Sequence, residues 1–119
     1  MSMPSYYVLI PAYNAGKFLT PLIQELMKYV ELDSILIVDD GSQDDTQEIL
    51  HQSGVHFIVH DTNQGKAGAL VSGFKWGIKK QKSWSITMDA DGQHSPDDLQ
   101  GFIRRIQELS VAGCDSSDQ

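Results

Sequence analysis

The chain has 119 residues, which is enough for one small domain with its own core but too few for two. A formal net charge of −7 argues against nonspecific binding to nucleic acid or to an anionic membrane surface, although a cation could still bring in an anionic ligand. The single cysteine, Cys114, excludes an internal disulfide and makes a reducing compartment the default. No signal peptide is visible, and no apolar run approaches the ~20 residues that a membrane helix needs, so we expect a cytoplasmic location.

Strands and helices are predicted to alternate along the chain. A continuous apolar run at residues 6–10, closed by Pro11, predicts a strand buried on both faces, and helical spacing of apolar residues at 17–30 predicts the first helix. A second strand is predicted at 34–38, and Ser42 followed by Asp45 resembles a capping box that starts a helix ending near His51. The same reasoning predicts a third strand at 55–59, a third helix at 66–80, a fourth strand at 84–88 and, after a serine cap at 95, a fourth helix to about 109.

This alternation predicts an α/β fold of the Rossmann-like kind, with a mainly parallel, doubly wound sheet between two layers of helices. In such sheets ligands bind outside the carboxyl ends of the strands. Polar stretches follow three predicted strands, at residues 11–14, 39–42 and 89–94, and a fourth precedes the third helix at 63–66. We therefore expect these four stretches to meet at one edge of the sheet and to form a ligand site there.

Two carboxylates end the fourth predicted strand. Asp89 and Asp91 are one residue apart, so their side chains lie on the same side of an extended backbone and can converge on one ion. Carboxylates at the end of a buried strand are costly unless something positive meets them. Hard oxygen ligands in this position suit a divalent cation, Mg²⁺ or Mn²⁺, that also holds a phosphate-bearing ligand.

Four motifs together carry a resemblance to a known family. They are Ile10-Pro11-Ala12-Tyr13-Asn14, the run from Val38 to Thr46, Asn63-Gln64-Gly65-Lys66-Ala67-Gly68-Ala69, and Met88-Asp89-Ala90-Asp91-Gly92-Gln93-His94. In order and spacing the chain resembles the N-terminal, nucleotide-sugar-binding half of family 2 glycosyltransferases with the GT-A fold. The last motif looks most like the branch that uses polyprenyl-phosphate acceptors, such as dolichol-phosphate mannosyltransferases. The resemblance covers residue 5 to about 109.

The resemblance implies a donor, a cation and a set of binding residues. The donor would be a UDP- or GDP-linked sugar, and a lipid-linked acceptor would bring the protein to the cytoplasmic face of a membrane only indirectly. Asp91 would bind Mg²⁺ or Mn²⁺ directly, while Asp89 would meet the ribose or a metal-bound water. Asp40, or its neighbour Asp39, would accept a hydrogen bond from the base, and Lys66 would lie near the base or the phosphates. The full set implied for the nucleotide sugar is Pro11, Ala12, Tyr13, Asn14, Asp39, Asp40, Gly65, Lys66, Asp89, Ala90 and Asp91.

One departure from the family concerns length. The family's catalytic domain continues beyond a fourth strand–helix unit into an acceptor half, which carries the acidic general base. We therefore expect residues 1–109 to form a nucleotide-sugar-binding subdomain, residues 110–119 to form a flexible polar tail, and no residue of this chain to act as the base. The chain would be a truncation, a natural fragment or half of an assembly. An exposed sheet edge would then invite self-association into dimers or larger oligomers.

Two other classes of function remain open at this point. One is a catalytically inactive nucleotide-binding or interaction module. The other is a phosphatase of the haloacid-dehalogenase type, whose Asp-x-Asp motif Asp89-Ala90-Asp91 matches, although no lysine follows Asp91. Several residues also have plainer interpretations: Tyr13 as packing, Asp39 to Ser42 as a turn, His60 as a surface or partly buried side chain, and the lysines at 75, 79, 80 and 82 as a solvated helix end.

Overall fold

The computed structural model of the chain describes residues 5–90, 100–101, 103–106 and 108. Their secondary structure runs β1 (Tyr6–Ala12), α1 (Gly16–Leu26), a short 3₁₀ helix (Leu32–Ser34), β2 (Ile35–Asp39), α2 (Thr46–Ser53), β3 (His56–Val59), α3 (Gly65–Lys79) and β4 (Trp84–Thr87). Residues 100–101, 103–106 and 108 are helical, within the range predicted for the fourth helix. The serine cap predicted at 95, Asp91 and the tail at 110–119 lie outside the described residues.

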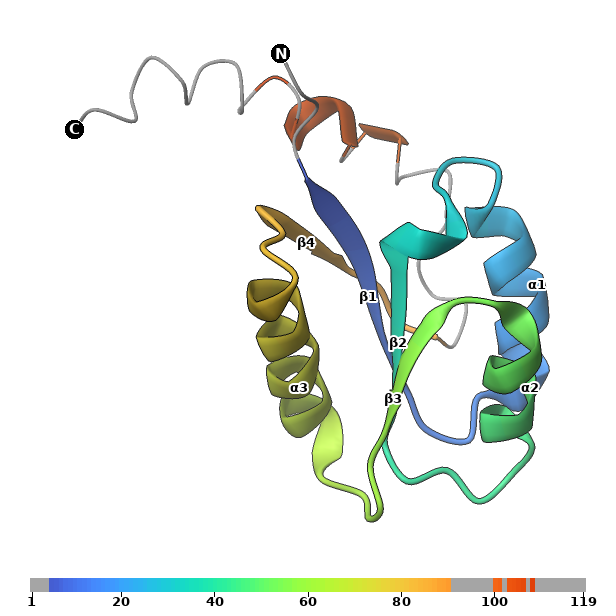
Figure 1. Cartoon of the computed structure of the whole chain (residues 1–119). Helices are drawn as coiled ribbons and strands as arrows, with labels where there is room; N and C mark the ends of the chain where they lie inside the picture. Colours follow the sequence, from blue (N-terminus) through green and yellow to red (C-terminus); the bar gives the residue numbers. More distant parts are fainter. Residues whose placement is uncertain (1–4, 91–99, 102, 107, 109–119) are drawn as a thin grey trace.

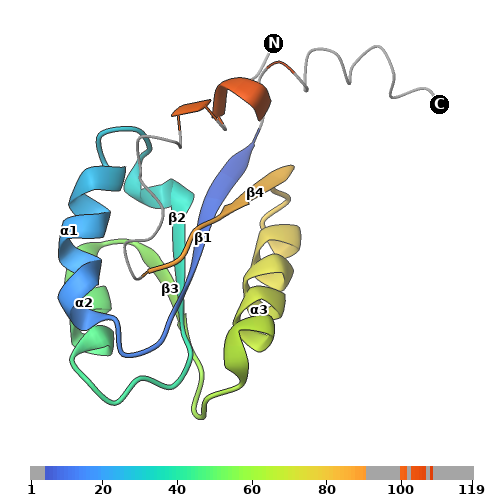
Figure 2. The ribbon, with the colours of Figure 1, turned by 180° about the vertical axis from the view of Figure 1, so that it is seen from behind.

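The fold has three layers, with the sheet in the middle. Helices α1 and α2 lie on one face of the sheet and α3 lies on the other, as Figures 1 and 2 show from opposite sides. The strands are ordered β3-β2-β1-β4, and every neighbouring pair is parallel. The predicted α/β fold with a parallel sheet is therefore confirmed.

The strand order places a switch point between β1 and β4. Along the chain the sheet grows from β1 through β2 to β3, and β4 then returns to the other side of β1. At such a switch point the loops after neighbouring strands leave in opposite directions and open a crevice. The segments that follow β1 and β4, at residues 13–15 and 88–90, therefore flank a natural position for a ligand.

Side chains from both faces of the sheet form the core. In β1, Val8 and Ile10 pack with α1 and α2, whereas Tyr7 and Leu9 pack beneath α3, and all four are buried. Burial on both faces explains why this strand shows no polar alternation. Helix α3 approaches closely because it presents Gly73 and Gly77 to the sheet, where a Cβ atom would overlap Leu9 and Tyr7.

Several predicted boundaries differ from the structure, among them the end of the first helix, which is Leu26 instead of residue 30. Strand β1 continues through Pro11 to Ala12 instead of closing at Pro11. The missing N–H of Pro11 falls beyond Leu9–Thr87, the last register pair of β1 and β4, so no ladder hydrogen bond is lost there. The prediction of Ser42 as a helix cap is wrong: α2 begins at Thr46, and the Ser42 hydroxyl instead accepts a hydrogen bond from the N–H of Asn14 at 2.8 Å.

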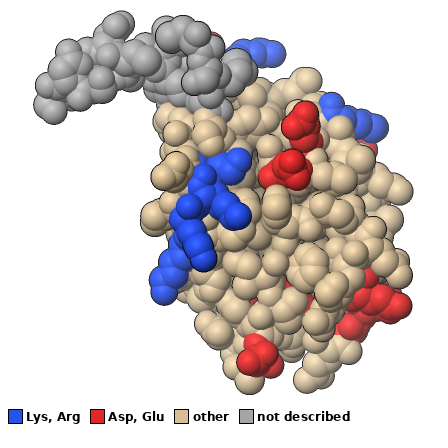
Figure 3. Space-filling model, in the orientation of Figure 1, with Lys and Arg blue, Asp and Glu red and all other residues tan. Residues whose placement is uncertain are grey.

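The molecule's lysines are unevenly distributed. Lysine and arginine gather over α3 on the face seen in Figure 3, and Lys75 and Lys79 of that helix are exposed.

Strand β4 forms one edge of the described sheet. Self-association through this edge remains a prediction. Among the described residues no helix is both long and apolar enough to span a membrane.

Candidate functional site

A cavity of about 520 Å³ opens at the carboxyl edge of the sheet, at the switch point. Its size falls in the range of small-molecule sites. The four polar stretches predicted to meet at this edge all contribute to it. The lining residues are Pro11, Ala12, Tyr13, Asn14, Ala15, Phe18, Asp40, Asn63, Gly65, Lys66, Ala69, Asp89 and Ala90.

Most of the predicted site residues therefore line one cavity, with two exceptions. Asp39 does not line it, and Asp91 lies outside the described residues. The structure adds Phe18, which the sequence did not single out, and Asn63, which belongs to a predicted polar stretch but was not named among the binding residues. Phe18 was predicted only as a helix position on an apolar stripe, yet its side chain is partly exposed at the cavity.

Asn14 joins the loop after β1 to the loop after β2. Its N–H donates to the Ser42 hydroxyl, and its side-chain oxygen accepts the N–H of Gln43 at 2.8 Å. Asn14 adopts a positive φ of 51°, a conformation that asparagine tolerates better than most residues. The two loops are thereby held together beside the cavity.

Asp44 provides a second connection between these loops. Its carboxylate accepts the N–H and the hydroxyl of Thr46, and it accepts the N–H of Gly16 at the start of α1 at 3.0 Å. Burial alone would raise the pKa of Asp44, but the hydrogen bonds from Thr46 and Gly16 outweigh it and hold that pKa below its ordinary value. Asp44 is therefore a carboxylate at neutral pH and fixes the start of α1 against the loop before α2.

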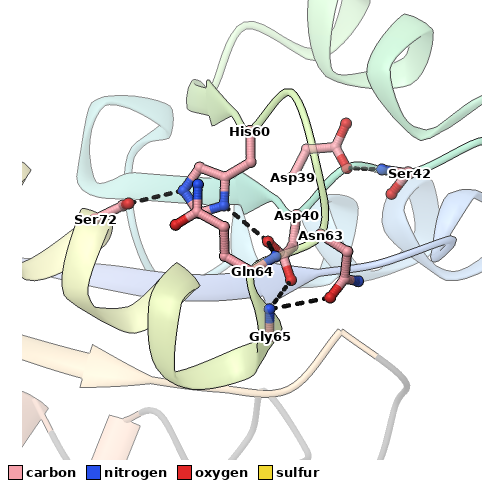
Figure 4. A network of polar contacts seen from close by, with 8 residues as sticks. All are labelled: Asp39, Asp40, Ser42, His60, Asn63, Gln64, Gly65 and Ser72. Carbon is pink, nitrogen blue, oxygen red and sulfur yellow. Dashed lines mark hydrogen bonds and ion pairs between the residues drawn. The ribbon is translucent and has the colours of Figure 1, made fainter.

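The neighbouring carboxylates of Asp39 and Asp40 have different surroundings (Figure 4). Asp39 is 1% exposed and accepts the N–H of Ser42 at 2.9 Å, so its side chain belongs to the turn after β2. Its other oxygen, Oδ2, is buried and has no hydrogen-bond partner within the part of the chain that the structure describes. Asp40 lines the cavity instead. Of the two acids that the resemblance offered, only Asp40 is placed to meet a ligand there.

The carboxylate of Asp40 accepts three hydrogen bonds. Oδ1 lies 2.8 Å from the backbone nitrogen of Gln64 and 2.8 Å from Nδ1 of His60, while Oδ2 lies 2.8 Å from the backbone nitrogen of Gly65. Burial acts to raise the pKa of Asp40, but the hydrogen bonds from His60, Gln64 and Gly65 prevail and lower that pKa. Asp40 therefore presents a fixed negative charge to the cavity.

Sequence reasoning missed the role of His60. Its side chain is buried, and its Nε2 lies 2.7 Å from the hydroxyl of Ser72 on α3. Asp40 is 20 residues away and Ser72 is 12 residues away, so no local pattern marks the three as neighbours. A histidine directly after a predicted strand is the only signal that the sequence offers.

Lys66 and Asp89 form an ion pair on another side of the cavity. Lys66 Nζ, in the first turn of α3, lies 2.8 Å from Asp89 Oδ1, after β4. The side chains are 64% and 28% exposed, so solvent screens the pair and it contributes little to folding, about 0–1 kcal/mol. A weakly stabilising pair of this kind can be rearranged by a charged ligand at low cost.

The described residues do not form a metal site by themselves. Among them no group of three or more histidine, cysteine, aspartate or glutamate side chains could hold an ion. Asp89 is one hard oxygen donor at the cavity, and Asp91 lies outside the described residues. Mg²⁺ and related ions commonly take one or two carboxylates and complete their coordination with phosphate and water. The donor set therefore fits such an ion when a phosphate-bearing ligand accompanies it.

A parallel α/β sheet with a polar cavity at its switch point defines the class of doubly wound, ligand-binding α/β domains. Residues 7–117 match the sequence model of the family described as Glycosyl transferase family 2. Since the match spans nearly the whole chain, the chain belongs to glycosyltransferase family 2. The resemblance read from the four motifs is thereby confirmed, and the haloacid-dehalogenase alternative falls away.

Curated relatives carry names of lipid-phosphate glycosyltransferases. The chain is 34% identical over 117 residues to a UDP-N-acetylglucosamine–dolichyl-phosphate N-acetylglucosaminyltransferase of Methanococcus voltae, with 84% of the chain and 46% of the relative covered. It is 31% identical over 108 residues to an undecaprenyl-phosphate mannosyltransferase of Micrococcus luteus, with 87% and 44% covered. The chain thus spans somewhat less than half the length of these relatives.

Solved structures share the fold. Glucosyl-3-phosphoglycerate synthase of Mycobacterium tuberculosis, solved with UDP, has a TM-score of 0.61 and 23% identity, over 82% of this chain and 38% of that one. The mannosyltransferase PcManGT of Pyrobaculum calidifontis, solved with GDP-mannose and Mn²⁺, has a TM-score of 0.51 and 20% identity, over 76% and 28%. At these identities the likeness concerns architecture, and it agrees with the expected GT-A fold.

Proposed function

We propose that this chain is the donor-binding part of a metal-dependent glycosyltransferase that takes a sugar from a nucleoside-diphosphate sugar. The observation that carries the proposal is the cavity of about 520 Å³ at the switch point. There the carboxylate of Asp40 stands at one wall, and the Lys66–Asp89 pair offers charges of both signs at another. A nucleotide sugar needs both kinds of surroundings, one for the base and one for the diphosphate.

The base would bind between the loop after β1 and Asp40. Pro11, Ala12 and Tyr13 line the cavity there, and the Tyr13 side chain is 51% exposed, so its ring is available for packing against a flat ligand. Asp40 would accept a hydrogen bond from an N–H of the base, because its carboxylate is ionised and buried. Both uracil and guanine offer such an N–H.

The diphosphate would bind near Lys66 and Asp89. Lys66 would contribute its positive charge to the phosphates, and Asp89, with Asp91, would hold Mg²⁺ or Mn²⁺. The bound cation would offset the negative charge that develops on the diphosphate as the bond to the sugar breaks. Gly65 and Ala90 would complete the wall between these groups.

We place the acceptor site and the acidic general base outside this chain, because the relatives that it matches are about twice as long. The names of those relatives support a polyprenyl phosphate as the acceptor. In this arrangement residues 1–109 form the donor subdomain, residues 110–119 form a tail, and the active protein meets its lipid acceptor at a membrane surface.

Calorimetric titration of the chain with UDP and GDP, with and without Mn²⁺, tests the proposal. We expect binding of at least one nucleotide that requires the cation and weakens at least about tenfold in Asp89→Asn and Asp91→Ala. Asp33→Asn is the matched control, because the Asp33 side chain is 88% exposed and does not line the cavity. Absence of binding to both nucleotides in the presence of Mn²⁺ would overturn the proposal.

A further inference from the structure

A row of three hydrogen-bonded polar side chains, two of them buried, lies behind the cavity wall. It runs from Ser72 on α3 through His60, after β3, to Asp40, after β2 (Figure 4). Asp40 lines the cavity, but His60 and Ser72 do not. The His60 side chain is only 7% exposed, so it can influence a ligand in the cavity only through Asp40.

The hydrogen bond between His60 and Asp40 has a fixed direction. An ionised carboxylate can only accept, so Nδ1 of His60 must carry the proton that it shares with Asp40. The other ring nitrogen, Nε2, shares a second hydrogen bond with the hydroxyl of Ser72. Ser72 therefore holds the ring of His60 from behind while Nδ1 donates to Asp40.

Counting acceptor sites shows what Asp40 has left to offer. A carboxylate oxygen has room for about two hydrogen bonds. Oδ1 already accepts from the N–H of Gln64 and from His60, whereas Oδ2 accepts only from the N–H of Gly65. One acceptor position thus remains, on Oδ2, in a side chain that lines the cavity. Without His60, Oδ1 would also have a vacant position, and only the two backbone N–H groups of Gln64 and Gly65 would hold the carboxylate.

We propose that His60 is a positioning residue for nucleobase recognition, which orients the Asp40 carboxylate so that Oδ2 meets an N–H on the edge of the base. The inference rests on the proposed function, since it takes the ligand to be a nucleotide. It assigns His60 no contact with the ligand. An apolar side chain could fill the same space as packing, but it could not occupy the second acceptor position of Oδ1.

The test compares ligands with and without a base. The unmodified protein and the variants His60→Leu and His60→Asn are titrated with UDP, GDP and inorganic pyrophosphate, each with Mn²⁺. We expect His60→Leu to weaken nucleotide binding about tenfold and to leave pyrophosphate binding unchanged. His60→Asn should restore most of the loss, because its amide nitrogen can donate from nearly the position of Nδ1. His56→Leu is the matched control, because His56 is the exposed first residue of β3 and does not line the cavity.

Further variants keep the inference testable if His60→Leu folds poorly. Ser72→Ala removes only the hydroxyl behind His60 and should give a smaller loss with the same dependence on the base. In the Asp40→Asn variant, the additional change His60→Leu should weaken nucleotide binding little further, because the two changes break the same interaction. Equal weakening of pyrophosphate and nucleotide binding, or no effect of His60→Leu on either, would overturn the inference. Failure of the unmodified chain to bind any nucleotide would instead overturn the proposed function, and this inference with it.

Discussion

Lys66 Nζ lies 2.8 Å from Asp89 Oδ1, and this ion pair connects the first turn of α3 to the segment after β4 across the cavity. The two residues are 23 positions apart and come from opposite sides of the switch point. A positive side chain thus already meets one of the two acids that were predicted to need a cation. Lys66 provides part of the compensating charge that a bound ion would supply.

Replacing Lys66 by methionine should show whether this side chain contributes to ligand binding or to the stability of the fold. The Lys66 side chain is 64% exposed, so Lys66→Met should change the free energy of unfolding by no more than about 1 kcal/mol. Binding of a nucleoside diphosphate with Mn²⁺ should weaken, since the lysine would no longer meet the phosphates. Urea unfolding and calorimetry measure the two quantities. A loss of stability well above this figure, with unchanged binding, would show that the pair is structural.

Substitutions of Tyr13 show whether its ring packs within the protein or against a ligand. Its side chain is 51% exposed, so Tyr13→Ala should leave the melting temperature nearly unchanged. If the ring packs against a base, the same change should weaken nucleotide binding by about 1–3 kcal/mol, while Tyr13→Phe should keep most of the affinity. A large drop in melting temperature for Tyr13→Ala would favour the plainer interpretation of packing within the protein.

Asp44 predicts how stability depends on pH. Its pKa in the folded protein is lowered from 3.8, so the unfolded chain takes up a proton first as the pH falls. The stabilisation from this carboxylate is therefore fully present above the unfolded pKa and disappears as the pH falls through the lower, folded value. Melting temperatures of the chain and of Asp44→Asn should differ most near pH 6 and converge as the pH falls below the lowered pKa of the folded protein. A constant difference across that range would contradict the shift.

Gly73 tests how closely α3 packs on β1. Alanine favours helices over glycine by up to about 1 kcal/mol, but a Cβ at this position would overlap the Leu9 side chain. We expect Gly73→Ala to destabilise the fold by about 1–3 kcal/mol in denaturant unfolding. Gly101→Ala is the control: it is also helical, no neighbouring atom of the described residues lies within 4 Å of the added Cβ, and the change should be neutral or stabilising. Neutral behaviour of Gly73→Ala would mean that Leu9 can move aside.

Most of the fold could be predicted because its signals are local. Apolar runs without alternation identify β1 and β2 as strands covered on both faces, and that pattern together with short connections leads to a parallel sheet. The capping prediction at Ser42 failed because of a contact between residues that are far apart in the sequence. A Ser-x-x-Asp pattern is also local, but a hydrogen bond from Asn14, 28 residues away, takes the serine hydroxyl.

The candidate site likewise has a part that could be predicted from the sequence and a part that could not. The polar loops gather at one edge because the strands are parallel. Residues such as Pro11, Lys66 and Asp89 were therefore expected near one another. Which of Asp39 and Asp40 faces the cavity depends on the direction in which β2 ends, and the pattern of residues alone left both open. The contribution of His60 depends on two partners in other elements, which no spacing along the chain reveals.

Helix α3 gives the two ends of the cavity a common mechanical support. Its first two residues, Gly65 and Lys66, bond to Asp40 and to Asp89, and Ser72, two turns later, holds His60. A helix behaves as a stiff rod over this length, so any shift of α3 moves the base end and the phosphate end together. A ligand that binds both ends immobilises a single rod once, whereas two separate fragments would each bear that entropic cost. An intact nucleoside diphosphate should therefore bind more tightly than the separate affinities of its nucleoside and pyrophosphate would indicate.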